Sequence, residues 1–211
     1  MGGPDAAPRI PPGELADIGV VNFALTRVLG AATGGGPPNV FTTLARHRKL
    51  FRRWLRFAGT LMPGGLLPRE ESELVILRVA HNCRCEYEWQ HHERFGRLAG
   101  LSPDEIERVR QGPDAAGWSP RRSLLLAAAD ELHAERRVSD ALWSQLAGLL
   151  GDRELIELCL LTSHYEMLAM TINSLRLAPD ALPSGSPSAL MRVGQKALGS
   201  RRRRAAAVPS R

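Results

Sequence analysis

Residues 81–92 read HNCRCEYEWQHH, and this stretch decides how the rest of the chain is interpreted. Its twelve positions hold three histidines, two cysteines, two glutamates, a tyrosine and a tryptophan. The rest of the chain is mostly leucine, alanine, arginine and glycine. Three interpretations are open for such a dense stretch: a reactive site, a metal site, or a polar part of the core.

The composition predicts an all-α fold. Of the 211 residues, 44% are hydrophobic and 24% are charged, as in a soluble globular protein with a sizeable core. Aromatic residues make up only 5%, so leucine and alanine must provide most of the packing. Few segments show the enrichment in β-branched and aromatic residues that is typical of strands.

The positive charge is concentrated at the end of the sequence. The net charge is +6, but residues 181–211 carry seven Lys and Arg and no acid, which leaves −1 for the other residues. A basic tail of this kind is usually solvated, so we expect residues 181–211 to be disordered and expect no specific binding of nucleic acid.

The sequence favours a cytoplasmic protein. No run reaches the roughly 18 apolar residues that a membrane span needs, and the first residues lack the apolar core of a signal peptide. Two of the three cysteines are separated by a single residue, which is not the spacing of a disulfide framework.

Apolar residues at helical spacing, together with capping residues, predict six to eight helices. Ser102 and Glu105 form the pattern of a capping box with Pro103 at the first helical position. The basic face of the helix expected over 40–62 either contacts an anionic surface or is solvated. The expected helices cover 14–30, 40–62, 68–82, about 85–100, a segment from 102, 119 to about 136, 139–151, and 152 to before Pro179.

Four residues in and before the dense stretch have the spacing of one site. Cys85, Glu88 and His92 share a helix face, and Glu73 faces them if the two helices fold back on each other. If a helix starts near Cys83 or Cys85, its dipole favours the thiolate. Two carboxylates and an imidazole in a half-buried crevice suit proton transfer, and burial would raise the pKa of one glutamate.

The pattern Glu73, Cys85-x-x-Glu88-x-x-x-His92 and then AGLSPDEI resembles the carboxymuconolactone decarboxylase family, which includes alkylhydroperoxidase AhpD-like proteins. The AhpD pattern is a glutamate, eleven residues and C-x-x-C-x-x-x-H, with GLS and EI soon after. The similarity is most specific over residues 70–112 and extends through about 140 residues. It implies an AhpD-like helical bundle over 38–180, preceded by a partly flexible extension (1–37) with one helix and followed by the basic tail.

The chain departs from the AhpD pattern at the second cysteine. In AhpD-like members that cysteine attacks the peroxide, the first cysteine resolves the disulfide, and glutamate and histidine relay protons. Here the position holds Glu88, which cannot cycle through a disulfide, and a Cys83–Cys85 disulfide would close a small, strained ring. Decarboxylase-type members of the family use acid–base chemistry without the cysteine pair.

Three functions follow from this resemblance. The first is acid–base chemistry, decarboxylation or isomerisation, on a small carboxylate or lactone, with Glu73, Cys85, Glu88 and His92 as candidate catalytic residues. The second is a thiol-dependent peroxidase using Cys85, and the third is a non-catalytic helical binding protein. Arg78 or Arg84 could bind a substrate carboxylate, although both suit an ordinary surface. The resemblance also implies a homo-oligomer, often built from trimers.

No metal or other cofactor is expected. The stretch offers His81, Cys83, Cys85, His91 and His92 as ligand types, but their spacing matches no standard zinc pattern. His164, in a second polar cluster at 162–167, is expected to be a hydrogen-bonded histidine at the edge of the core. Cys159 is expected in the core.

Overall fold

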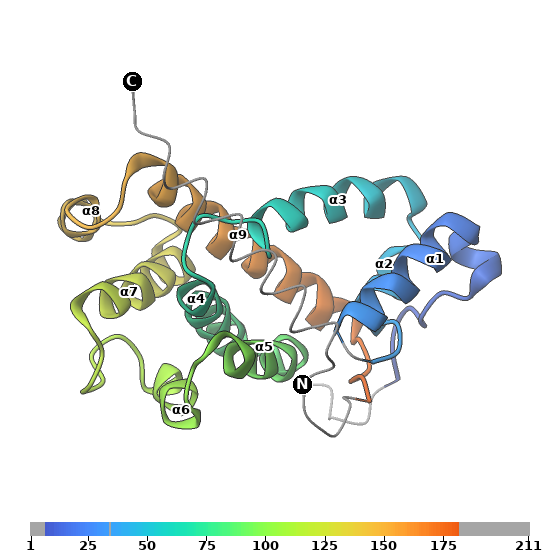
Figure 1. Ribbon diagram of the computed structural model, residues 1–211. Helices are drawn as coiled ribbons and strands as arrows, with labels where there is room; N and C mark the ends of the chain where they lie inside the picture. Colours follow the sequence, from blue (N-terminus) through green and yellow to red (C-terminus); the bar gives the residue numbers. More distant parts are fainter. Residues whose placement is uncertain (1–6, 34, 182–211) are drawn as a thin grey trace. The chain divides into compact units, whose positions relative to one another are not determined.

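The computed structural model describes residues 7–33 and 35–181, and this part of the chain is all-α, as predicted (Figure 1). It contains nine helices and no strand. They are α1 (Leu15–Thr33), α2 (Asn39–Leu44), α3 (Arg48–Leu61), α4 (Arg69–Asn82), α5 (Glu86–Ala99), α6 (Pro103–Gln111), α7 (Pro120–Glu135), α8 (Asp140–Ala147) and α9 (Asp152–Leu175). The chain divides into two compact units, one of residues 65–174 and one of residues 1–64 with 175–211.

The unit of residues 65–174 is built around α4. Seven consecutive residues of α4, Glu71 to Leu77, are buried, so this helix is covered on nearly all sides. Its apolar side chains form a core with residues from α5, α6 and α7, and Figure 1 shows these helices around it. This core contains Leu74, Leu77, Ala80, Trp89, Leu101, Ile106, Val109 and Leu126. Burying each large apolar side chain contributes about 1.5–3 kcal/mol to folding.

The helix ends follow the capping residues. Ser102 and Glu105 form the predicted capping box, and Ser119 and Ser139 cap α7 and α8. Gly100 ends α5 with φ 113°, a left-handed conformation that glycine adopts without strain. Pro68 takes the position before α4, one residue earlier than the sequence suggested.

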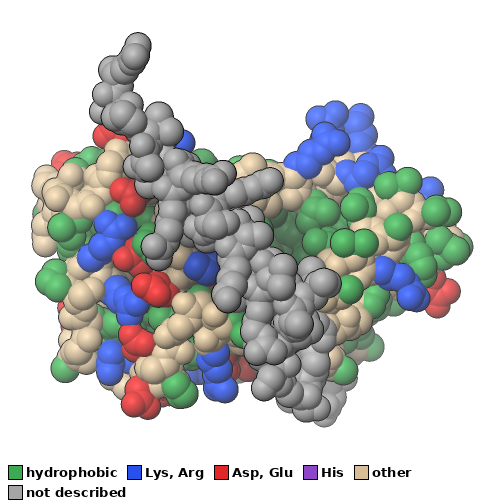
Figure 2. Space-filling model, in the orientation of Figure 1, with side chains coloured by type: hydrophobic (Ala, Val, Ile, Leu, Met, Phe, Trp, Pro, Cys, Tyr) green, Lys and Arg blue, Asp and Glu red, His purple; other side chains and the backbone are tan. Residues whose placement is uncertain are grey.

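The helix expected over 40–62 is two helices, and side chains from α1 contact the junction between them. Asn22 Nδ2 donates to the carbonyl oxygen of Ala45 at 3.3 Å, and Arg46 pairs with Asp17 at 2.9 Å. α2 ends at Leu44 and α3 begins at Arg48, so residues 45–47 separate the two helices. The basic residues of α3 gather on the face seen in Figure 2.

The longest helix, α9, is long and apolar enough to cross a membrane by length and composition. However, 56% of its most apolar window is buried inside the fold, and its buried residues include Glu157, His164 and Glu166. Glu157 accepts hydrogen bonds from the backbone N–H groups of Leu66 and Leu67 at 2.5–2.9 Å, which ties α9 to the start of α4. These polar contacts are typical of a core helix.

Residues 181–211, where the sequence predicts a disordered basic tail, lie outside the described residues except for Ala181.

Candidate functional site

The predicted fold-back of two helices brings Glu73 and His92 into contact. Glu73 lies in α4 and His92 lies in α5, and the connection between the helices reverses the chain within residues 83–85. His92 Nδ1 is 2.7 Å from Glu73 Oε2. Gly96, one turn after His92, faces Leu77 and Glu73, and its missing side chain lets α5 approach α4 closely.

Glu73 is completely buried, and it has a second partner on its own helix. Arg69 Nη2 lies 2.6 Å from Glu73 Oε1, an i, i+4 ion pair. A buried carboxylate is costly unless it is paired, and here an imidazole and a guanidinium share the two oxygens. Sequence reasoning identified Glu73 but missed Arg69.

The ring of His92 is held by its neighbours and presents its other nitrogen. Phe95 and Tyr165 contact the imidazole edge-to-face, with ring centroids 5.5 Å and 5.0 Å away. Nδ1 of His92 is taken by Glu73, and the side chain keeps 11% of its surface exposed. If Nδ1–H donates the hydrogen bond to Glu73, Nε2 of the neutral ring carries the lone pair.

Glu88 and Cys85 are adjacent and buried at the start of α5. Glu88 is 2% exposed and Cys85 is 1% exposed, and neither oxygen of Glu88 has a hydrogen-bond partner in the described residues by strict geometry. Burial raises the pKa of Glu88 well above its usual range, and the charge of Glu166 adds to the rise. Burial thus favours the neutral acid form of Glu88, although a hydrogen bond with Cys85 acts in the opposite direction on its pKa.

The expected activation of the thiol at the helix start is wrong. Cys83 ends α4 rather than beginning α5, and Cys85 takes the capping position of α5. Burial and then the charge of Glu88 raise the pKa of Cys85, and these effects exceed the favourable backbone hydrogen bond from Glu88. The thiol form is favoured at both cysteines, since burial and Glu166 raise the pKa of Cys83 to about 12.

Tyr165 joins this group from α9, eighty residues later in the sequence. Its ring is buried against His92, and burial together with the charge of Glu73 raises the pKa of its hydroxyl above the usual range. The adjacent His164 is also buried, and burial lowers its pKa to about 4. The polar pattern of residues 162–167 marked this segment, but only the fold shows that Tyr165 faces His92.

A second polar cluster lies beside Cys83. Cys83 Sγ is 3.2 Å from Glu166 Oε1 and 3.9 Å from His133 Nδ1, and His133 Nδ1 is 2.5 Å from the same carboxylate oxygen. Of the ligand types in the dense stretch, Cys83 alone joins a group of this kind among the described residues. His133 and Glu166 come from α7 and α9, so no spacing within the stretch could have indicated them.

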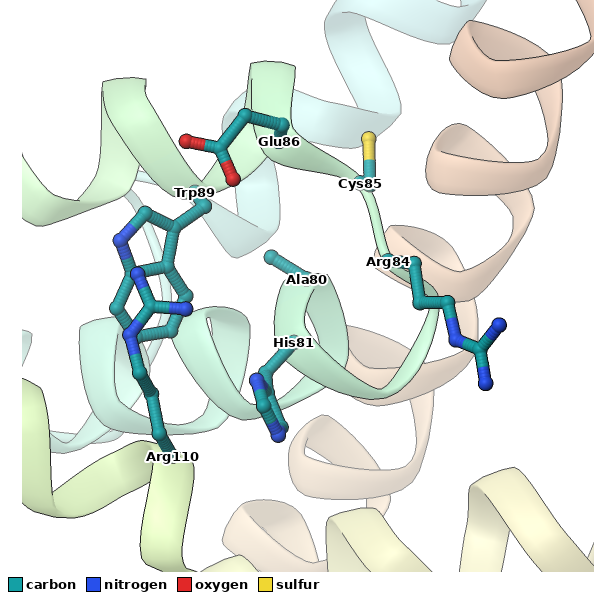
Figure 3. A pocket seen from close by; sticks show the side chains of 7 residues that line it. All are labelled: Ala80, His81, Arg84, Cys85, Glu86, Trp89 and Arg110. Atoms are coloured by element: carbon teal, nitrogen blue, oxygen red, sulfur yellow. The ribbon is translucent and has the colours of Figure 1, made fainter. Parts of the chain in front are cut away.

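A surface cavity of about 240 Å³ opens on the other side of the α4–α5 connection (Figure 3). It is lined by His81, Arg84, Cys85, Glu86, Trp89 and Arg110. Arg110 stacks on the Trp89 ring, with Cζ 3.7 Å from its centroid, while the Cys85 sulfur points away from His81 in Figure 3. Cys85 is thus part of the cavity wall.

Neither arginine proposed for substrate binding lies at the Glu73–His92 pair. Arg78 binds Asp130 through two nitrogens at 2.6 Å and 2.8 Å and also donates to the carbonyl oxygen of Val109. Arg84 is exposed, with a left-handed φ of 51° in the connection between the helices. Arg78 thus has a structural role, and Arg69 is the cation at the pair.

The fold and the site define an all-α protein in which a helical hairpin buries an acid–imidazole pair. Residues 48–131 match the model of the carboxymuconolactone decarboxylase family. A search of curated protein sequences finds no match.

Several solved structures share the fold. One is an uncharacterized peroxidase-related protein from Ralstonia eutropha JMP134, described as an alkylhydroperoxidase AhpD core, with 23% identity, a TM-score of 0.74, and coverage of 83% of this chain and 95% of that one. A peroxidase-related protein from Silicibacter sp. TM1040 has 18% identity, a TM-score of 0.73, and coverage of 84% and 96%. The debrominase Bmp8 has 12% identity, a TM-score of 0.70, and coverage of 90% and 97%.

Proposed function

We propose that the protein is a carboxymuconolactone decarboxylase-like enzyme that performs acid–base chemistry, decarboxylation or isomerisation, on a small carboxylate or lactone in the cytoplasm. The observation that carries the proposal is the 2.7 Å contact between Glu73 and His92 Nδ1, which leaves Nε2 available to a substrate. A carboxylate behind an imidazole orients the ring and stabilises its protonated form. Glu73 is the positioning residue and His92 is the catalytic residue in this arrangement.

Glu88 supplies the second half of acid–base chemistry. Glu88 and His92 are one helical turn apart on α5, so both can face one small substrate. The burial that raises the pKa of Glu88 favours its protonated form, which suits it to the role of a proton donor. When a carboxylate leaves as carbon dioxide, the electron pair of the broken C–C bond remains as an enolate, and a neutral acid can deliver the proton that this enolate needs.

Arg69 and Tyr165 give the site its polarity. Arg69 places a permanent positive charge beside Glu73, where a substrate carboxylate can share it. Tyr165 covers one side of the imidazole and limits the access of water to it. Restricted access of water strengthens the interaction between these charges and a developing enolate.

The experiment is a turnover assay on small carboxylated lactones, followed by ultraviolet absorbance and carbon dioxide release. We expect His92→Gln and Glu73→Gln to lower kcat by about 100-fold or more with little change in KM, because both act on proton transfer rather than on binding. His91→Gln is the matched control, since His91 neighbours His92 but packs on Tyr87, whereas His92 contacts Glu73 and Tyr165. Circular dichroism checks that each variant is folded.

A hydroperoxide assay on the wild type and on Cys85→Ser separates the other two functions. Turnover of an organic hydroperoxide that requires Cys85 would replace the proposal by a thiol-dependent peroxidase. If the folded wild-type protein turns over neither a lactone nor a hydroperoxide, the remaining hypothesis is a non-catalytic binding protein. Lactone turnover that survives both His92→Gln and Glu73→Gln would contradict the assigned roles.

A further inference from the structure

Cys83, His133 and Glu166 place three different metal-binding atoms within 4.8 Å of one another. They come from the end of α4, the last turn of α7 and the middle of α9, and all three lie in the unit of residues 65–174. None of them belongs to the Glu73–His92 pair. The cluster is therefore a separate feature of the molecule, whatever the reaction at His92.

The spacing of these atoms is close to that of a tetrahedral metal centre. Zinc bonds of about 2.0–2.3 Å at tetrahedral angles hold their ligand atoms about 3.3–3.8 Å apart. The distance from sulfur to carboxylate oxygen is 3.2 Å, and the distance from sulfur to imidazole nitrogen is 3.9 Å. Only the 2.5 Å distance between His133 and Glu166 must lengthen, by about an ångström, which side-chain rotation supplies.

The backbone around Cys83 is fixed independently of any ligand. Asn173 Nδ2, in α9, donates to the carbonyl oxygen of Cys83 at 2.9 Å. The N–H of Cys83 donates to the carbonyl oxygen of Val79 at 2.8 Å, within the last turn of α4. Cys83 is thus held against α9, the helix that carries Glu166. A site whose atoms are held before a metal arrives loses less entropy on binding it.

The carboxylate of Glu166 favours a cation at the cluster, because it is buried and has few groups around it to share its charge. Arg136 lies 3.4 Å from Glu166 Oε2, but its side chain is 70% exposed and can swing into solvent.

We propose that Cys83 Sγ, His133 Nδ1 and Glu166 Oε1 form a site for a divalent cation of borderline softness, such as Zn²⁺. One thiolate, one imidazole and one carboxylate are ligands that zinc accepts together. On binding, the Cys83 thiol and any protonated imidazole release their protons to solvent as the sulfur–metal and nitrogen–metal bonds form. Three protein ligands leave a fourth position for water or a small ligand. His133 and Cys83 are only partly buried, so a cation can reach them.

The test uses the untagged full chain, stripped of metal with a chelator and titrated with Co²⁺ and then Zn²⁺. We expect one Co²⁺ per chain, with a thiolate-to-cobalt absorption band in the near ultraviolet that Zn²⁺ abolishes. Cys83→Ser should remove the band, and Glu166→Gln and His133→Ala should weaken binding at least about 10-fold. Cys159→Ser is the matched control, because Cys159 is another partly buried free cysteine and should leave the titration unchanged.

Thermal unfolding gives a second readout that needs no absorption band. Zn²⁺ should raise the Tm of the wild-type protein and of Cys159→Ser, but not that of Cys83→Ser. If Cys83→Ser fails to fold, His133→Ala serves instead, since the side chain of His133 is one-third exposed. The proposal is overturned if no cobalt–thiolate band forms, or if the folded Cys83 or His133 variant binds Co²⁺ as tightly as the wild type. No substrate is involved, so this result is independent of the proposed reaction.

Discussion

Glu88 is the residue whose environment differs most from that of a glutamate in water. It is buried, its oxygens lack hydrogen-bond partners in the described residues, and Glu166 adds a like charge. The folded protein therefore holds a proton on Glu88 that the unfolded chain releases above a pKa of 4.5. Between this pH and the raised pKa, the unfolded state binds fewer protons, so the free energy of unfolding falls as the pH rises.

We predict that Glu88→Gln removes this part of the pH dependence, because an amide has no proton to lose. The difference in slope between wild type and Glu88→Gln is at most about 1.4 kcal/mol per pH unit, the value for one proton. Urea unfolding at pH 5, 6 and 7 measures it. Glu86→Gln, an exposed position two residues earlier, should keep the wild-type slope. Equal slopes for wild type and Glu88→Gln would show that Glu88 is ionised in the fold.

The sequence predicted the candidate site as far as local spacing allowed. The contact between Glu73 and His92 could be predicted from the sequence, because two adjacent helices with a short connection can pack against each other in few ways. The positions of Tyr165 and Glu166 near the site could not be predicted. Both residues lie in α9, and no pattern within residues 73–92 indicates where that helix packs. The prediction that the helix dipole favours the thiolate of Cys85 was wrong for a related reason. The dipole follows from the local sequence, whereas the burial that raises the pKa of the thiol depends on the whole fold.

At the scale of the helices, α4 is the element through which the rest of its unit is organised. Its Glu73 binds α5, and its Arg78 binds Asp130 of α7 and the last carbonyl groups of α6. Arg78 is thus at once a bidentate partner of a carboxylate and a cap for a helix end. Only a guanidinium has enough donors in one plane for both contacts.

We predict that Arg78→Lys lowers the free energy of unfolding by about 1–3 kcal/mol, because an ammonium cannot replace the bidentate pair and the carbonyl contacts together. Chemical denaturation measures the change. Arg84→Lys is the control, since Arg84 is exposed, and it should change stability by less than about 0.5 kcal/mol. A stability of Arg78→Lys equal to that of the control would mean that the ion pair contributes nothing.

Helix positions were predictable where the chain supplies its own caps. Ser102, Ser119 and Ser139 each stand directly before a helix, and each accepts the expected backbone hydrogen bond. The division between α2 and α3 was not predictable, because residues 40–62 keep a continuous helical pattern. At the break, the carbonyl of Ala45 accepts a hydrogen bond from Asn22 of α1, a contact that no pattern within residues 40–62 indicates.

For the whole molecule, charge and fold are carried by different parts of the chain. Residues 181–211 hold a net charge of +7 within a total of +6, so the other residues sum to −1. On the face shown in Figure 2, acidic and basic side chains are interspersed over much of the described part, with a basic group over α3. The net positive charge of the chain therefore does not indicate a basic binding surface on the described part of the fold.

We predict that a protein ending at Ala181 keeps the stability of the full chain and loses its binding to a cation exchanger at pH 7. The contacts of Asn39 with Ala178 and Asp180, at 3.1 Å and 2.9 Å, lie before the cut and stay intact. The truncated chain has a net charge of −1, so its retention should fall to that of a neutral protein. A salt gradient measures the retention and thermal unfolding measures the Tm. Retention that survives the cut would place the cation-exchange surface on α3, where Lys49, Arg53 and Arg56 face outward, and a lower Tm would show that the tail stabilises the fold.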